Sequence, residues 1–129
     1  MNTIVQALKK VGVFFVATID GEQSRVRPFS AVEEIDGKIC FITSNQKDVY
    51  KQIVLHPCIE ISGMNKDGTW VRVNGRMKTL SDDKITQVFL DLNPGLKTMY
   101  SVGDGKVTIL ELTEAKGMLY SFTDTPKEI

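Results

Sequence analysis

The chain has 129 residues, about the length of one domain, and a chain of this size can fold around its own core without disulfides or metal. Its 16 Lys and Arg offset its 16 Asp and Glu, and this balance disfavours a general nucleic-acid binder. Two cysteines and one histidine disfavour a metal site, and no apolar run is long enough to span a membrane. With no signal-peptide pattern at the N-terminus, we expect a single cytoplasmic domain over residues 1–129.

Apolar periodicity in the first half predicts two helices and three strands. In chain order they are a helix over 3–11, strands over 13–19, 23–35 and 38–43, and a helix over 45–55. The run 13–19 is rich in β-branched and aromatic residues, which is typical of a strand buried on both faces. Pro28 interrupts the second strand, because proline cannot donate to the hydrogen-bond ladder.

The second half predicts four more strands and one more helix. In chain order they are strands over 58–64 and 69–80, a helix from 81–83 to 93–95, a loop over 96–105, and strands near 106–113 and 117–123. Most of the seven strands are joined by tight turns, and the repeated helical crossovers of a doubly wound sheet are missing. The pattern therefore favours a mainly β fold, a small antiparallel barrel with short peripheral helices.

Few residues suit nucleophilic or acid–base catalysis. The only histidine, His56, precedes Pro57 at a predicted helix end and gives little support to a Ser–His or Cys–His pair. The carboxylates of Asp82 and Asp83 are explained by their place at a helix N-terminus. No glycine-rich phosphate loop is present. We therefore assign no catalytic residue.

One group of residues has the chemistry of a phosphate site. Two arginines lie two apart on a strand, and two hydroxyls and two lysines surround the start of the following helix. These residues are Arg25, Arg27, Thr43, Ser44, Lys47 and Lys51. A helix N-terminus offers free N–H groups and a positive dipole end, which cations and hydroxyls complete. The alternative is a solvated basic face with a serine cap.

Three aromatic or apolar positions are open to two interpretations each. Phe29 is placed to line a flat aromatic ligand next to the basic group. Trp70, the sole tryptophan, suits either strand packing or a stacking wall or interface anchor. Met99 and Tyr100 follow the third helix, where they can close over a ligand or cover the end of the barrel.

The order and spacing of these features resemble a known family. The segments that carry the resemblance are residues 25–32, 37–53, 56–57 and 69–75. They are similar to the pyridoxamine 5′-phosphate oxidase-like, FMN-binding split-barrel family, and to its short single-domain branch of nitroimidazole-resistance-type reductases. This resemblance spans nearly the whole chain. It implies a six-stranded antiparallel split barrel with flanking helices, a homodimer, and FMN at the dimer interface.

The resemblance also assigns residues to the cofactor. They are Arg27, Pro28, Phe29, Ser30, Ile42, Thr43, Ser44, Lys47, Lys51 and Trp70. In this assignment Arg27 and Lys47 meet the flavin phosphate, with Lys51 a weaker candidate. The 28–30 backbone follows the isoalloxazine ring, and residues 42–44 meet the ring edge and the ribityl phosphate. Trp70 stands where the family reaches the flavin from the partner subunit, often with glutamine.

Two departures from the family narrow the expected activity. The tryptophan- and arginine-containing segment with which true pyridoxamine phosphate oxidases bind substrate is missing after Ile129, so we expect no vitamin B6 oxidase. Val32 stands where those oxidases carry a phosphate-binding lysine, which weakens the expected FMN affinity.

We therefore expect an FMN-dependent oxidoreductase that acts on a small, aromatic or nitro-substituted molecule. The flavin would carry the electron chemistry, which explains the lack of an acid–base pair. The alternatives are a non-catalytic flavin binder for electron transfer, storage or stress sensing, the same barrel with F420 or haem, and an interaction domain without cofactor. His56 is the only histidine and lies at a predicted helix end, where it is poorly placed to ligate haem. F420 has an anionic tail and would need a broader basic groove than a chain of zero net charge suggests.

Overall fold

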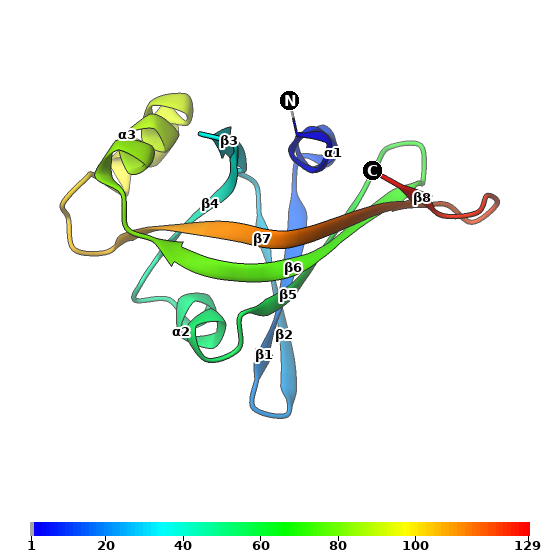
Figure 1. The fold of residues 1–129 in the computed structure, drawn as a ribbon, viewed down its shortest axis with the longest axis horizontal. Helices are drawn as coiled ribbons and strands as arrows, with labels where there is room; N and C mark the ends of the chain where they lie inside the picture. The colour runs from blue at the N-terminus through cyan, green and yellow to red at the C-terminus, as the bar shows by residue number, and fades with distance from the viewer. Residues whose placement is uncertain (1) are drawn as a thin grey trace.

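A computed structural model describes residues 2–129, which form one antiparallel sheet with helices at its sides (Figure 1). The helices are α1 (Thr3–Val11), α2 (Asp48–Leu55) and α3 (Asp83–Leu92), with a 3₁₀ turn η1 (Pro94–Thr98) after α3. The strands are β1 (Phe14–Asp20), β2 (Gln23–Phe29), β3 (Glu33–Ile35), β4 (Lys38–Ser44), β5 (Cys58–Met64), β6 (Trp70–Leu80), β7 (Val107–Tyr120) and β8 (Lys127–Glu128). None of the helices in this range is both long and apolar enough to cross a membrane.

The sheet is a barrel that does not close. Its strand order is β2-β1-β5-β6-β7-β4-β3, with β8 paired to β7, and every pairing is antiparallel. The first and last strands of this order, β2 and β3, are not paired with each other. Since β3 and β8 have only three and two residues, six longer strands build the frame. This arrangement confirms the predicted antiparallel split barrel.

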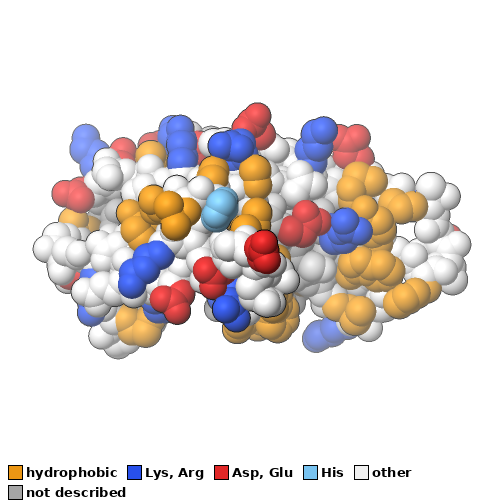
Figure 2. Space-filling model, turned by 90° about the horizontal axis from the view of Figure 1, so that it is seen from below, with side chains coloured by type: hydrophobic (Ala, Val, Ile, Leu, Met, Phe, Trp, Pro, Cys, Tyr) orange, Lys and Arg blue, Asp and Glu red, His pale blue; other side chains and the backbone are white. Residues whose placement is uncertain are grey.

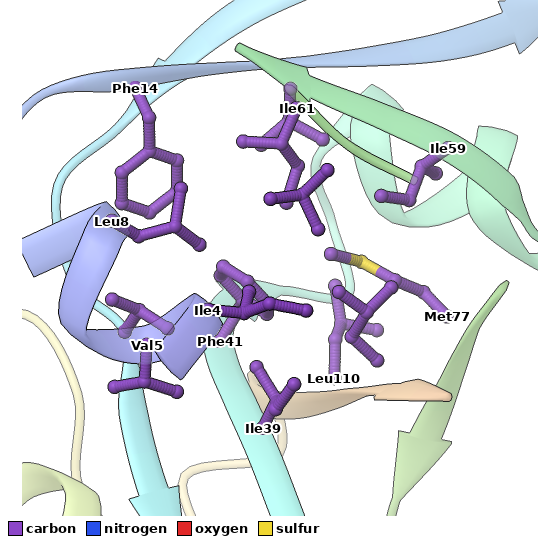
Figure 3. Packing of buried hydrophobic residues seen from close by; sticks show 14 of the residues in the cluster. Ile4, Val5, Leu8, Phe14, Ile39, Phe41, Ile59, Ile61, Met77 and Leu110 are labelled. Carbon is purple, nitrogen blue, oxygen red and sulfur yellow. The ribbon is translucent and has the colours of Figure 1, made fainter. Parts of the chain in front are cut away.

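The inner face of the sheet holds the main core. Leu8 of α1 belongs to one buried cluster with Phe14 of β1, Phe41 of β4, Ile61 of β5 and Leu110 of β7 (Figure 3). The Phe14 and Phe41 rings meet edge to face with centroids 5.9 Å apart. Burial of apolar surface on this scale is the main favourable contribution to folding.

The prediction that 13–19 is buried on both faces was wrong. Burial alternates along β1, so that Phe14 and Val16 face the core whereas Phe15 and Ile19 are 48% and 41% exposed. The run is apolar on both faces, but within one chain only its inner face is covered. The outer face of β1 therefore presents apolar side chains to solvent.

The predicted strand over 23–35 is divided into β2 and β3. The division falls at residues 30–32, and Pro28 stays in register opposite Phe15. Proline is tolerated there because β2 is an edge strand, whose outward N–H groups have no partner strand. The two strands predicted near 106–113 and 117–123 are instead one, β7. Glu114 adopts a positive φ of 52° and the register with β6 shifts between Asn74 and Arg76, so a bulge replaces the predicted break.

Gly75 provides a test of packing at this bulge. A Cβ at Gly75 would lie 2.7 Å from the backbone oxygen of Thr113 and 2.8 Å from a methyl group of Leu112. We expect Gly75→Ala to lower the free energy of unfolding by about 1–3 kcal/mol in urea denaturation. Gly95→Ala is the matched control, because no atom lies within 4 Å of its Cβ position. Equal stability of the two variants would contradict this account of the bulge.

Candidate functional site

Three hollows meet around the start of α2. The first, here called the ring pocket, has a volume of about 210 Å³ and lies between the ends of β2 and β4 and the segment after α3. The second, the basic cleft, has a volume of about 790 Å³ and lies between the β1–β2 hairpin and α2. The third, the outer hollow, has a volume of about 430 Å³. Lys47 lines all three, and Arg27 lines the ring pocket and the basic cleft.

The ring pocket brings together most of the residues that the sequence assigned to the cofactor. Those in its wall are Arg27, Pro28, Phe29, Ser30, Ile42, Thr43 and Lys47. Lys51 instead lines the basic cleft, and Ser44 lines the outer hollow. Nine of the ten assigned residues therefore surround one connected region, and Trp70 is the exception.

The start of α2 follows directly from β4. The Lys47 N–H donates to the carbonyl of Ser44 at 3.1 Å, and the Gln46 N–H donates to the Ser44 hydroxyl at 3.2 Å. The N-cap of α2 is Lys47, which makes no side-chain cap hydrogen bond. The serine therefore caps the turn before the helix, which differs from the alternative of a serine helix cap. An uncapped helix N-terminus presents backbone N–H groups that a ligand can use.

Arg27, on β2, is held by hydrogen bonds to two other elements, β1 and α2. Its Nη1 donates to the carbonyl of Val16 at 3.1 Å and to the Thr18 hydroxyl at 2.6 Å, both on β1. Its Nη2 donates to Oε1 of Gln52 on α2 at 2.7 Å. The Thr18 hydroxyl in turn donates to the same Gln52 oxygen. A guanidinium has five N–H donors, so these three bonds leave two for a ligand.

The electrostatic surroundings of Arg27 are mixed. Burial lowers the pKa of its guanidinium, the Asp48 carboxylate raises it, and the positive charge of Arg25 lowers it further. An arginine stays protonated through such shifts. The site therefore keeps a fixed, partly desolvated cation whose position is set by neutral hydrogen-bond partners.

The rest of the ring pocket is apolar and aromatic. Phe29 lies against Phe41, with ring centroids 6.4 Å apart, and this contact anchors the end of β2 to the core. Met99 and Tyr100 form the opposite wall with Leu96. Tyr100 is buried in a second apolar cluster with Phe89 and Ile109, so it covers the end of the barrel, whereas Met99 is 52% exposed. A flat ring with one anionic group fits a pocket with aromatic walls and two cations at its edge.

Trp70 lies apart from this region within one chain. It begins β6 opposite Tyr120, at the end of β7, whereas Ser44 pairs with Val107 at the start of β7. The rings of Trp70 and Tyr120 stack with centroids 5.7 Å apart, and the Arg72 guanidinium lies 4.9 Å from the Tyr120 centroid. The aromatic cluster therefore lies outside the region that the three hollows form.

Sequence reasoning missed Thr18 and Gln52, which position Arg27. The signal at Thr18 was a polar residue inside the apolar run of 13–19. Gln52 gave no signal, because its role depends on α2 packing beside β1.

The hydrogen bonds of Thr18 can be tested by removing one oxygen. Thr18→Val keeps the shape but leaves an Arg27 donor without its partner, so we expect the free energy of unfolding to fall by about 1–3 kcal/mol. Valine is at least as favourable as threonine in a strand, so propensity would not produce this loss. Urea denaturation measures it, with Thr125→Val on the exposed C-terminal segment as control. An unchanged stability of Thr18→Val would show that the network contributes nothing.

Comparisons with known proteins agree with the split-barrel fold. The sequence pattern described as pyridoxamine 5′-phosphate oxidase matches residues 2–119. A NimC/NimA family protein from Clostridium acetobutylicum is 40% identical and superposes with a TM-score of 0.93, over 98% of this chain and 88% of that one. No curated protein sequence matches the chain.

Two more distant structures share the fold. An FAD-binding protein from Mesorhizobium loti has a TM-score of 0.63 at 14% identity, over 94% of this chain and 96% of that one. A haem-binding protein from Mycobacterium smegmatis has a TM-score of 0.73 at 11% identity, over 100% of this chain and 58% of that one. Taken with the split barrel, the match over residues 2–119 places this chain in the pyridoxamine 5′-phosphate oxidase family, where it is similar to NimC/NimA proteins.

Proposed function

We propose that this protein binds FMN in the ring pocket and acts as an oxidoreductase on a small aromatic or nitro-substituted molecule. The observation that carries the proposal is the convergence of aromatic walls with Arg27 and Lys47 at one pocket edge. Bound flavin would supply the electron transfer. The chain would supply binding, orientation and exclusion of water, which requires no catalytic acid or base.

The residues present fit such a cofactor. Lys47 and the two remaining donors of Arg27 would hold the phosphate, together with the hydroxyls of Thr43 and Ser44. Phe29 and Tyr100 would flank the ring system, and the segment of Met99 would limit access of water. Flavin binding at these residues requires no proton transfer to or from a side chain of the pocket.

The other ligands are less well supported. The FAD-binding and haem-binding proteins that share the fold show that this barrel type is used with different cofactors. Haem commonly takes a side-chain ligand such as histidine. His56 is exposed and lines the basic cleft, away from the ring pocket. We therefore favour a flavin over haem.

The flavin proposal predicts a phosphate-specific effect of Lys47. We expect Lys47→Gln to weaken FMN binding about tenfold to hundredfold, because a charge-assisted contact to the phosphate is lost. Riboflavin, which lacks the phosphate, should bind the wild type and the variant equally. Quenching of flavin fluorescence measures both affinities, and Lys84→Gln on α3 is the control for loss of one surface charge.

Two further results separate the possible roles. A wild-type protein that binds neither FMN nor riboflavin would rule out the flavin proposal and favour a domain without cofactor. If FMN binds, reduction by NADH or NADPH with turnover of a nitroaromatic acceptor would identify a reductase. Failure of both donors to reduce bound FMN would favour a non-catalytic flavin binder.

We also propose that the outer face of the sheet joins two copies of the chain. Phe15 lies opposite Pro28 on this face. Figure 2 shows a further gathering of apolar side chains at the β7–β8 end of the molecule, where the aromatic cluster of Trp70 lies. Exposed apolar side chains gathered in this way are typical of a subunit interface.

A charge on this face should prevent association. We expect the wild type to have twice the 14.4 kDa chain mass by light scattering, and Phe15→Glu to have the mass of one chain. Val88→Glu changes an equally exposed apolar residue on α3 and should remain a dimer. A wild type of single-chain mass would refute the interface.

A further inference from the structure

We propose that the basic cleft binds the adenylate part of a dinucleotide, with its second phosphate at Arg25 and Lys51. This inference rests on the proposed flavin site and extends it to the neighbouring hollow. It names the ligand class as a dinucleotide that carries adenine next to a pyrophosphate.

The cleft is continuous with the ring pocket at the residues that would hold the first phosphate. Arg27, Lys47 and Val49 line both hollows. Consider a ligand whose ring fills the ring pocket and whose phosphate contacts Arg27 and Lys47. The phosphate of this ligand lies at the opening of the cleft. The 790 Å³ of the cleft lies within the range of small-molecule sites.

The wall of the cleft carries more cations than carboxylates. Four cations line it, Arg25, Arg27, Lys47 and Lys51, against the carboxylates of Asp20 and Asp48. Within residues 2–129 neither Lys47 nor Lys51 forms an ion pair. Arg25 is bonded to Asp20 only through Nε, at 3.0 Å. Its four terminal N–H donors remain, in a fork that suits phosphate.

The cleft also carries exposed aliphatic side chains among these charges. Ile19, Val26 and Leu55 are 41%, 65% and 76% exposed and line the same hollow. Figure 2 shows apolar side chains beside the histidine on this side of the molecule. An inorganic ion or an acidic tail gains nothing from such surface. A purine base covers apolar surface, so a ligand with both phosphate and base accounts for both kinds of side chain.

The test compares three probes at near-physiological ionic strength, where distant surface charges are screened. FMN carries the first phosphate alone, FAD carries the adenylate part as well, and ADP carries the adenine and pyrophosphate without a flavin. Each is titrated into the full-length protein and into Arg25→Gln/Lys51→Gln. Lys66→Gln/Lys84→Gln removes the same charge from exposed positions elsewhere.

Lys51 lines the basic cleft and not the ring pocket, so here it is assigned to the second phosphate and no longer to that of FMN. We therefore expect the Arg25→Gln/Lys51→Gln variant to bind FAD and ADP about tenfold more weakly than the wild type, and FMN less than about twofold more weakly. The Lys66→Gln/Lys84→Gln variant should match the wild type. Displacement of FAD by ADP would identify the flavin's own adenylate as the occupant. Competition of ADP with NADPH on the FMN-loaded protein would identify the electron donor instead.

Two outcomes would overturn the inference. One is equal loss of FMN and FAD affinity in the Arg25→Gln/Lys51→Gln variant, which would reduce the cleft to part of a single phosphate site. The other is that ADP does not bind, or that its affinity does not change when Arg25 and Lys51 are replaced. That result would show that the cleft does not recognise an adenine nucleotide. If ADP binds and responds but no flavin binds, the flavin proposal fails and the adenylate site stands.

Discussion

The guanidinium of Arg27 is the contact on which the rest of the site depends. It ties the edge strand β2 to the carbonyl of Val16 and the hydroxyl of Thr18 on β1, and it ties both strands to Gln52 on α2. An edge strand has only one neighbour, so such a side-chain bond fixes its distance from the helix that follows β4. That distance sets the width of the ring pocket and of the basic cleft, which share Arg27 and Lys47. A cation held by neutral partners in this way loses little entropy when an anion binds.

The sequence located the residues of the candidate site because they lie at the ends of regular elements. Proline and phenylalanine end β2, two hydroxyls end β4, and Lys47 precedes α2. Local patterns of this kind can be recognised without knowledge of the tertiary fold. The hydrogen bonds of Thr18 and Gln52 cannot be predicted in this way, since they depend on how α2 lies against β1. The same reason hides the separation of Trp70 from the pocket, because it follows from the length of β7 and its register with β6.

The errors in the predicted fold have a common physical origin. Alternation and composition report which side chains avoid water, but they do not report what covers them. The run over 13–19 is apolar on both faces, and one chain covers only the inner one. Likewise, Pro28 reads as an interruption, although an edge strand tolerates it, and 114–117 reads as a break, although a positive φ at Glu114 absorbs the extra residue within β7. In each case the missing fact is how the neighbouring strands are arranged.

Net charge misled for a related reason, because it averages over positions that the fold separates. The chain is neutral, yet the basic cleft has twice as many cations as carboxylates in its wall. The net charge of zero did not indicate a basic groove, but the basic cleft is one, and it lies next to the ring pocket. The aromatic walls of the ring pocket contact the ring of a ligand, so they do not distinguish ligands by their number of phosphates. Under the proposed assignment, discrimination between a mononucleotide and a longer ligand arises in the cleft, where binding of the extension is coupled to the first phosphate through the shared side chains of Arg27 and Lys47.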